Sequence, residues 1–163
     1  MAVLESVQVL QQEQRDEVGK GTHGVVLHCD GGGLPKPPEE CTNKQIGNYG
    51  EDLAAIFLES CGLLILERNW RCSFGEVDII AQDDETLVLV EVKTRIACLE
   101  DNEIAPEVAV GYRKQAKYRK LALFYLSRHP RFEAVRFDVV AVQLHGENDA
   151  IVRHLDGAYE WDD

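Results

Sequence analysis

The segment at residues 86–94, Thr-Leu-Val-Leu-Val-Glu-Val-Lys-Thr, restricts the fold more than any other part of the chain. Side chains alternate between the two faces of a β-strand, so its valines share one face and its leucines share the other. A strand that is apolar on both faces lies in the middle of a sheet covered on both sides. The segment therefore predicts a layered α/β domain. Glu91 and Lys93 extend the leucine face, where an unpaired charge would be costly.

The neighbouring segments predict helices and strands in the order αβββαβ. The expected elements are a helix capped by Asn48 and ended by Gly62, strands over 63–70, 76–82 and 86–94, a helix over 112–128, a strand over 135–144 and a weaker one over 150–155. Short turns favour antiparallel pairing of the first three strands, and the later helix permits a parallel crossover.

The chain is long enough for one domain with a substantial core. Residues 1–44 contain a polar stretch, a glycine triplet and a proline-rich run. We expect them to form a flexible N-terminal extension, with a short helix around residues 3–14 as its one regular element. The folded domain is expected over residues 45–155, followed by an acidic tail over 156–163.

Composition and the first residues of the chain bear on its location. The sequence has five cysteines, an odd number without a close pair, which is typical of free thiols in a reducing compartment. The N-terminus lacks the basic and apolar regions of a secretion signal, and no stretch reaches the roughly 18 apolar residues that span a bilayer. We therefore expect a cytoplasmic protein without membrane contact. His23, His28, Cys29 and Cys41 do not have the spacing of a zinc module.

The net charge of −12 disfavours a nucleic-acid partner over most of the chain. Residues 111–137 differ, because they contain eight basic residues and one acidic residue. Arg113, Lys117 and Lys120 fall at i, i+4 and i+7 of the expected helix, with Lys114 adjacent. This basic stripe could bind phosphates weakly and in a salt-sensitive way, although such stripes are also common as solvated helix faces.

A second acid precedes Glu91 by one hairpin. Asp78 lies between Val77 and Ile79 on an apolar strand, so its charge also needs a partner. Two carboxylates can bind Mg²⁺ or Mn²⁺, and the ammonium group of Lys93 can orient or help deprotonate a water molecule. Acid–base pairs on strands also serve as salt bridges or as protection against edge pairing. Spacing alone leaves both interpretations open.

Two further polar residues are candidates for the same site. Glu51 lies three residues before Ala54, at the start of the apolar face of its helix, so its carboxylate could reach the sheet. It could instead close a capping box with Asn48. Gln115 could donate a hydrogen bond to a phosphate or to a catalytic water.

Several blocks occur in a characteristic order between about residues 47 and 144. They are Gly50-Glu51-Asp52-Leu53-Ala54, Arg68-Asn69-Trp70-Arg71, Gly75-Glu76-Val77-Asp78, Val90-Glu91-Val92-Lys93-Thr94-Arg95, Lys114-Gln115 and Arg136-Phe137-Asp138-Val139-Val140. The chain thereby resembles the YraN-like family of uncharacterised bacterial proteins within the PD-(D/E)xK nuclease superfamily. The resemblance implies a three-layer α/β/α restriction endonuclease-like fold with a mixed central sheet.

The resemblance also implies roles for individual residues. It makes Asp78 and Glu91 the metal-binding acids, Lys93 the catalytic lysine, Glu51 the acid of the first helix and Gln115 an accessory polar residue. Val77 stands where the superfamily has a proline, and the start of the helix that carries Gln115 departs from the family pattern.

Together these observations predict a metal-dependent nuclease that hydrolyses phosphodiester bonds in branched, damaged or single-stranded DNA. Asp78, Glu91 and the Val92 carbonyl would hold Mg²⁺ or Mn²⁺, and Lys93 would position the attacking water. A homodimer would suit a two-strand cut. The alternatives are an inactive nucleic-acid-binding module and a protein-interaction module that keep the nuclease fold.

Overall fold

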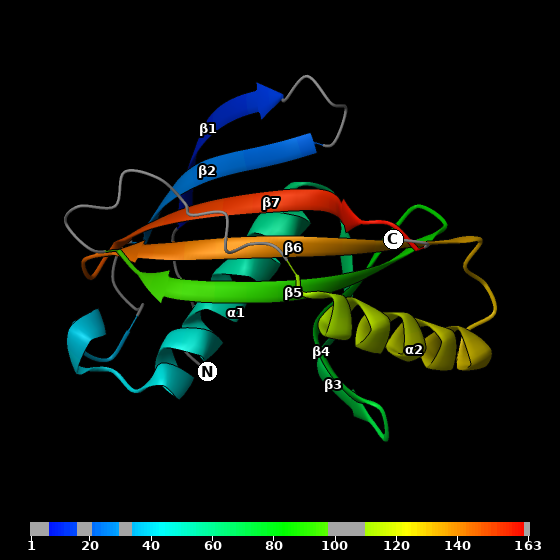
Figure 1. Cartoon of the computed structure of the whole chain (residues 1–163). Helices are drawn as coiled ribbons and strands as arrows, with labels where there is room; N and C mark the ends of the chain where they lie inside the picture. The colour runs from blue at the N-terminus through cyan, green and yellow to red at the C-terminus, as the bar shows by residue number, and fades with distance from the viewer. Residues whose placement is uncertain (1–6, 16–20, 30–33, 98–109, 162–163) are drawn as a thin grey trace.

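The computed structural model describes residues 7–15, 21–29, 34–97 and 110–161. Within these residues, the strands form a seven-stranded mixed sheet, and one long helix lies on each of its faces (Figure 1). The strands are β1 (Val7–Arg15), β2 (Gly21–Cys29), β3 (Leu64–Cys72), β4 (Gly75–Asp83), β5 (Thr86–Ile96), β6 (Ala134–His145) and β7 (Asp149–Tyr159); the helices are η1 (Pro38–Glu40), α1 (Asn43–Ser60) and α2 (Tyr112–Arg128).

The sheet has the strand order β1-β2-β7-β6-β5-β4-β3. β5 and β6 pair in parallel, and all other neighbours pair antiparallel. The predicted order αβββαβ is confirmed by α1, β3, β4, β5, α2 and β6, and α2 lies in sequence between the two parallel strands. β5 is central and buried on both faces, because its alternating valines and leucines each face a helix layer.

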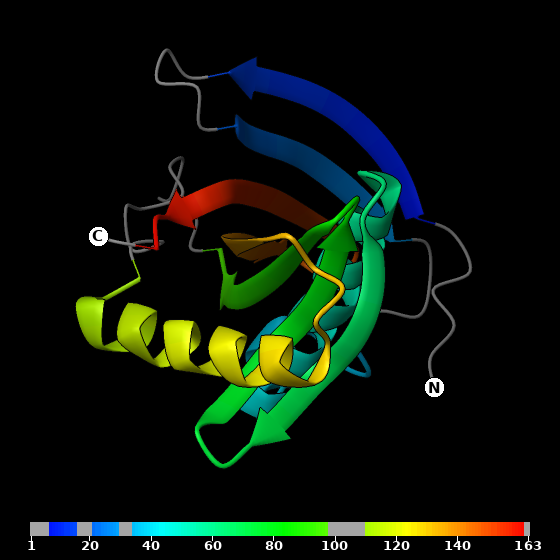
Figure 2. The same cartoon turned by 90° about the vertical axis from the view of Figure 1, so that its right-hand side faces the viewer.

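The two helices cover opposite faces, which gives the predicted three layers (Figures 1 and 2). α1 packs on the face that carries Val88, Val90 and Val140, and this core continues to β2 through Leu27. On the other face, α2 buries the apolar residues of a second core, which are Val77, Ile80, Leu87, Leu89, Phe137, Val139, Tyr118, Leu121, Ala122 and Tyr125.

The start of α1 differs from the prediction. Thr42 caps the helix by accepting a hydrogen bond from the Gln45 backbone, and the Gln45 side chain accepts from Thr42 in return. Asn48 therefore lies inside α1, and a capping box between Asn48 and Glu51 is wrong. The predicted stop at Gly62 is confirmed, since this glycine adopts a φ of 93° immediately after the helix.

The N-terminal segment is also different from the expectation. Residues 7–15 and 21–29 form strands that extend the sheet from β7, where a flexible extension with a short helix was predicted. The buried side chains of Val25, Leu27 and Cys29 explain why β2 packs here. At the other end, β7 continues to Tyr159, so residues 156–159 belong to a strand and not to an acidic tail.

A buried charge network lies on the α1 side of the sheet. Asp138 is 1% exposed and receives hydrogen bonds from the Arg136 guanidinium, at 2.9 Å for Nε, and from the Gly157 backbone N–H. His154 Nε2 lies 2.8 Å from Asp138 Oδ2, and Arg136 Nη1 donates to Asp83. These partners outweigh burial, which alone would raise the pKa of Asp138, and lower that pKa below its usual value.

Candidate active site

Asp78 lies where the β4–β5 ladder ends. The last pair on this side is Ile79 with Val90, and beyond it the Asp78 carboxylate accepts the backbone N–H of Val92 at 2.8 Å. The side chain thus takes a donor that a continued ladder would have used. This arrangement ties Asp78 of β4 to the backbone of β5, next to Glu91.

Glu91 is 7% exposed and has two partners on α2. Its Oε2 accepts from the Tyr118 hydroxyl at 2.6 Å, and its Oε1 forms an ion pair with Lys114. Burial and the charges of Glu91 and Asp78 raise the pKa of Tyr118, so its hydroxyl remains a donor. Lys114 and Tyr118 are four residues apart and share one face of the helix.

Glu51 of α1 approaches the same region from the other helix. Its carboxylate accepts from the Asn69 side chain of β3 at 2.8 Å. Asn69 has a φ of 51°, a left-handed conformation that asparagine tolerates better than most residues. The charge of Glu51 contributes to the raised pKa of Asp78, and its role in a shared site stays a prediction.

The electrostatics of this region are dominated by the acids. Burial raises the pKa of Asp78 to about 6, the charges of Glu91 and Glu51 add to the rise, and the Val92 N–H and Lys114 oppose it. A raised pKa means that the negative charge on Asp78 is poorly compensated. A cation placed among these oxygen atoms would relieve that excess.

Lys93 lies on the same face of β5 as Glu91, two residues further along the strand, and is partly buried. Its β6 neighbour in the register is Ala141. Gln115 lies at the start of α2, where its side-chain amide donates to the Val110 carbonyl at 2.8 Å. Its contribution to chemistry stays a prediction.

The predicted basic stripe divides into two parts. Arg113 and Lys120 are exposed, as a phosphate-binding face requires, and Lys117 packs against Gly75 of the β3–β4 turn. Lys114 instead belongs to the acidic site through its ion pair with Glu91. The roles of Lys114 and Tyr118 were not predicted; their spacing of four residues indicates a shared helix face but not that this face meets Glu91.

These acids do not form a closed cage. Within residues 7–15, 21–29, 34–97 and 110–161, no three His, Cys, Asp or Glu side chains lie close enough together to hold a metal ion. Both oxygens of Glu91 are bound by residues of α2, Oε1 by Lys114 and Oε2 by Tyr118. The donor chemistry, hard carboxylate oxygens from several elements, nevertheless suits a divalent cation.

The fold defines the class of protein: a mixed α/β domain of nuclease-like architecture, in which Asp78 lies at the end of a β-ladder and Glu91 pairs with Lys114. The chain belongs to the uncharacterised protein family UPF0102, whose model matches residues 50–142. This confirms the resemblance to the YraN-like family.

Curated relatives agree with this assignment. A UPF0102 protein of Thermodesulfovibrio yellowstonii is 44% identical over 115 residues, which cover 71% of this chain and 96% of the relative. One from Syntrophus aciditrophicus is 50% identical over 107 residues, or 64% of this chain and 81% of the relative. One from Parafrankia sp. is 43% identical over 118 residues, or 72% and 98%.

No helix within the described residues combines the length and apolar character needed to cross a membrane. The cytoplasmic location stays a prediction.

Proposed function

We propose that the protein is a metal-dependent nuclease that hydrolyses phosphodiester bonds in DNA. The observation that carries this proposal is the position of Asp78. Its carboxylate is fixed by the Val92 N–H beside the buried Glu91, and its pKa is raised to about 6 by burial and by neighbouring acids. Buried acids with poorly compensated charge are typical of sites that hold a divalent cation.

Asp78, Glu91 and the Val92 carbonyl would hold Mg²⁺ or Mn²⁺, which when bound supplies charge stabilisation at the phosphate and lowers the pKa of water. Lys93 shares the Glu91 face and would hold the attacking water in line with the phosphate. Glu51, which accepts a hydrogen bond from Asn69, would add a third negative charge to those of Asp78 and Glu91. Opening the Glu91–Lys114 ion pair would free Oε1 for this role.

The basic residues of α2 would hold the DNA backbone. Arg113 and Lys120 are exposed, and α2 also carries Lys117 on the turn that follows Lys114. Since the chain as a whole has a charge of −12, we expect weak binding that salt reduces steeply. A homodimer that cuts both strands stays a prediction.

One observation favours a second candidate, an inactive nucleic-acid-binding or protein-interaction module. Glu91 already has Lys114 and Tyr118 as partners, so this charge is satisfied without a cation. Asp78 argues against that alternative, because its neighbours include further acids and its pKa is raised.

The test is cleavage of a panel of single-stranded, branched and duplex oligonucleotides with Mg²⁺, with Mn²⁺ and with EDTA. We expect cleavage only with a divalent cation, and a loss of about 100-fold or more in Asp78→Asn and Lys93→Ala. Asp84→Asn and Lys44→Ala change an exposed acid and an exposed lysine outside the site and serve as matched controls.

Circular dichroism of each variant would establish that the fold is retained. An inactive wild type across the whole panel with both metals would refute the nuclease proposal. Equal activity of Asp78→Asn and wild type would move the active site elsewhere.

A further inference from the structure

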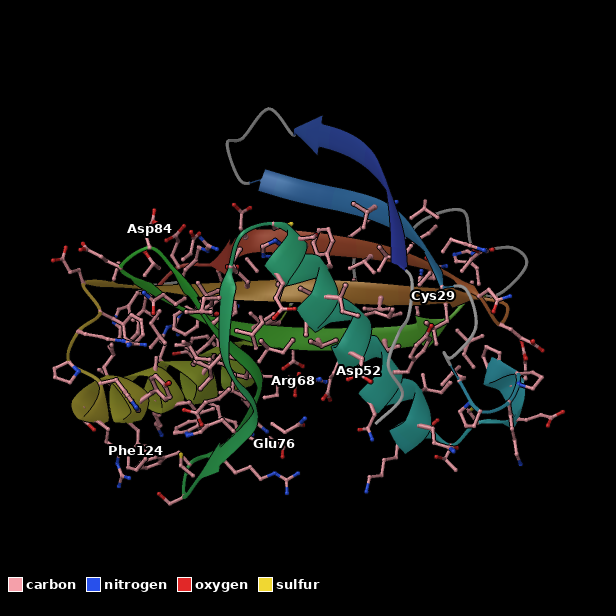
Figure 3. The ribbon with its side chains drawn as sticks, turned by 180° about the vertical axis from the view of Figure 1, so that it is seen from behind. Cys29, Asp52, Arg68, Glu76, Asp84 and Phe124 are labelled. Atoms are coloured by element: carbon pink, nitrogen blue, oxygen red, sulfur yellow. The ribbon has the colours of Figure 1, made fainter. Side chains whose placement is uncertain are left out.

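Aromatic and basic side chains meet beside α2, away from the acids. The end of the β3–β4 hairpin extends from the rest of the sheet and passes next to α2 (Figures 1 and 2). Phe74, in the hairpin turn, is 51% exposed, and its ring centroid lies 5.5 Å from that of Phe124 on α2. Figure 3 shows Phe124 on α2 near the hairpin that carries Glu76.

Phe124 packs against a further ring of the hairpin. Trp70 of β3 contacts Phe124 with 6.1 Å between ring centroids, and it meets the buried Tyr125 edge-on at 5.3 Å. Phe74 and Phe124 are themselves inclined at 67°, so their rings do not stack on each other. An exposed aromatic ring packed against other rings suits a flat, apolar ligand group.

Cations surround the rings. Arg128 lies over Phe124, with its Cζ 4.6 Å from the ring centroid. The Lys117 side chain crosses Gly75 so closely that a Cβ built on this glycine would lie 2.1 Å from Lys117 Cε. Lys120 is exposed, and the spacing of positions 117, 120, 124 and 128 puts them on one stripe of α2.

Glu76, the acid beside the turn, forms an ion pair with Arg71 at 3.1 Å. The surface made of Phe74, Lys117, Lys120, Phe124 and Arg128, called here the hairpin–helix surface, is therefore positive as well as aromatic. Both properties suit one ligand class, a single-stranded nucleic acid, whose bases stack on aromatic rings while its phosphates attract cations.

We propose that the hairpin–helix surface binds unpaired nucleotides next to the cleavage position. The proposal rests on the proposed function, since it takes the bound strand to be the substrate of the Asp78–Glu91 site. α2 connects the two places: Lys114 is in the acidic site and Phe124 follows ten residues later. That separation is about 15 Å along a helix, a length spanned by on the order of four nucleotides at the B-DNA rise.

The preferred substrate is therefore a strand that is single-stranded on one side of the cut, such as a flap or a junction arm with unpaired bases. In a duplex the base faces are covered by neighbouring bases, so a duplex would contact only the basic side chains of this surface. Binding should depend on bases as well as on phosphates, and this dependence separates the surface from an ordinary basic patch.

The test is fluorescence anisotropy of the full chain in EDTA, so that no cleavage is needed. The probes are a labelled oligothymidine of 15 nucleotides, an abasic strand of equal length and a duplex. We expect the wild type to bind oligothymidine most tightly. Phe74→Ala should lose about tenfold in affinity for oligothymidine, the order of one base–aromatic stack, and none for the abasic strand. Phe74→Trp keeps an aromatic ring and should bind oligothymidine like the wild type.

Leu123→Ala is the matched control, because Leu123 is 56% exposed on the same helix but lines the apolar groove beside Trp161. It should bind like the wild type. Equal affinity of Phe74→Ala and wild type for oligothymidine, or equal affinity of the wild type for abasic and base-containing strands, would overturn the proposal. A wild type that binds no oligonucleotide would also overturn it, and the exposed rings would then be a candidate surface for a protein partner.

The outcome is independent of the nuclease test. Base-dependent binding without any cleavage would support the hairpin–helix surface and refute the nuclease proposal. Cleavage together with binding that does not depend on Phe74 would support the nuclease proposal and refute the role of the surface.

Discussion

At the residue scale, Glu91 is the carboxylate whose partners decide what the site can do. It is buried against α2, where Tyr118 donates to one oxygen and Lys114 pairs with the other. A cation that enters beside Asp78 must compete with the Lys114 ammonium for Glu91. The same lysine that stabilises the metal-free protein should therefore weaken its affinity for metal.

Lys114→Ala tests this competition. Removing the ammonium leaves a buried carboxylate with Tyr118 as its partner, which should lower the free energy of unfolding in EDTA by about 1–3 kcal/mol. Manganese should then raise the melting temperature more than it does in the wild type. Urea denaturation and thermal unfolding with and without Mn²⁺ measure both effects. Lys120→Ala is the exposed control, and a smaller Mn²⁺ shift in Lys114→Ala than in the wild type would contradict the argument.

Asp138 gives a prediction about stability that is separate from the site. Asp138→Asn breaks the buried pair with Arg136 and His154 and should cost about 3–5 kcal/mol at pH 7. Because the folded pKa of Asp138 is lowered, its contribution is present above the unfolded value of about 3.9 and is lost as the pH falls through the folded pKa.

The difference in unfolding free energy between wild type and Asp138→Asn should thus shrink as the pH falls below 4, as urea denaturation can measure. Asp149→Asn, which changes an exposed acid paired with His28, should cost less than about 1 kcal/mol. A difference that grows below pH 4 would be the contrary result.

The sequence predicted the acids and the lysine but not their partners. Strand alternation is enough to place Glu91 and Lys93 on one face, because the period of a strand is fixed. The pairing with Lys114 depends on how α2 is rotated on the sheet, which is set by the packing of Tyr118 and Leu121. No local pattern contains that information.

At the scale of elements, the contact between α1 and β5 positions Glu51. Gly50 precedes Glu51 and faces Thr94 of β5, where a Cβ built on the glycine would lie 1.8 Å from Thr94 Oγ1. Only glycine allows the helix to lie this close to the strand. The approach brings Glu51 toward Asp78 and Asn69.

Gly50→Ala should push α1 away from β5, cost about 1–3 kcal/mol of stability and reduce cleavage. Gly47→Ala is the matched change in the same helix, since a Cβ there meets nothing within 4 Å. This variant should have a free energy of unfolding about 0.5–1 kcal/mol higher than the wild type, because alanine has the higher helix propensity. Urea denaturation of both variants makes the comparison. If the two substitutions had equal effects, the close approach would not matter.

Element bounds were predicted best where stop signals are strong. The helix over 112–128 was predicted with the bounds of α2, because Pro130 and the preceding periodicity leave little choice. The start of α1 was misplaced because the sequence contains two capping patterns, one at 42–45 and one at 48–51. Asn48 and Glu51 imitate the box that Thr42 and Gln45 form.

At the scale of the whole molecule, the sheet is wider than the sequence suggested. The polar composition of residues 8–17 led to the prediction of a flexible extension for the whole N-terminal segment. Val25, Leu27 and Cys29 alternate along β2, and their side chains enter the α1 core. The three-layer class could be predicted because β5 alone demands cover on both faces. The addition of β1 and β2 could not, since β2 joins the sheet by pairing with β7, which lies over a hundred residues away in the sequence.

Deleting residues 1–33 should therefore destabilise the domain. The truncation removes buried side chains of β2, each worth about 1.5–3 kcal/mol when fully buried, and leaves β7 as an open edge. We expect a lower urea midpoint and concentration-dependent association. Leu27→Ala in the full chain removes buried contacts and keeps the edge covered, so it should lose stability without associating. A truncated chain with the full-length midpoint would show that β1 and β2 add nothing.

The central claim is that Asp78 and Glu91 share a divalent cation, and a crystal soaked in Mn²⁺ tests it most directly. We predict an anomalous scattering peak in contact with both carboxylates and with the Val92 carbonyl, together with a displaced Lys114 ammonium. A well-ordered site that shows no peak between Asp78 and Glu91, with Lys114 still paired to Glu91 at millimolar Mn²⁺, would contradict the account.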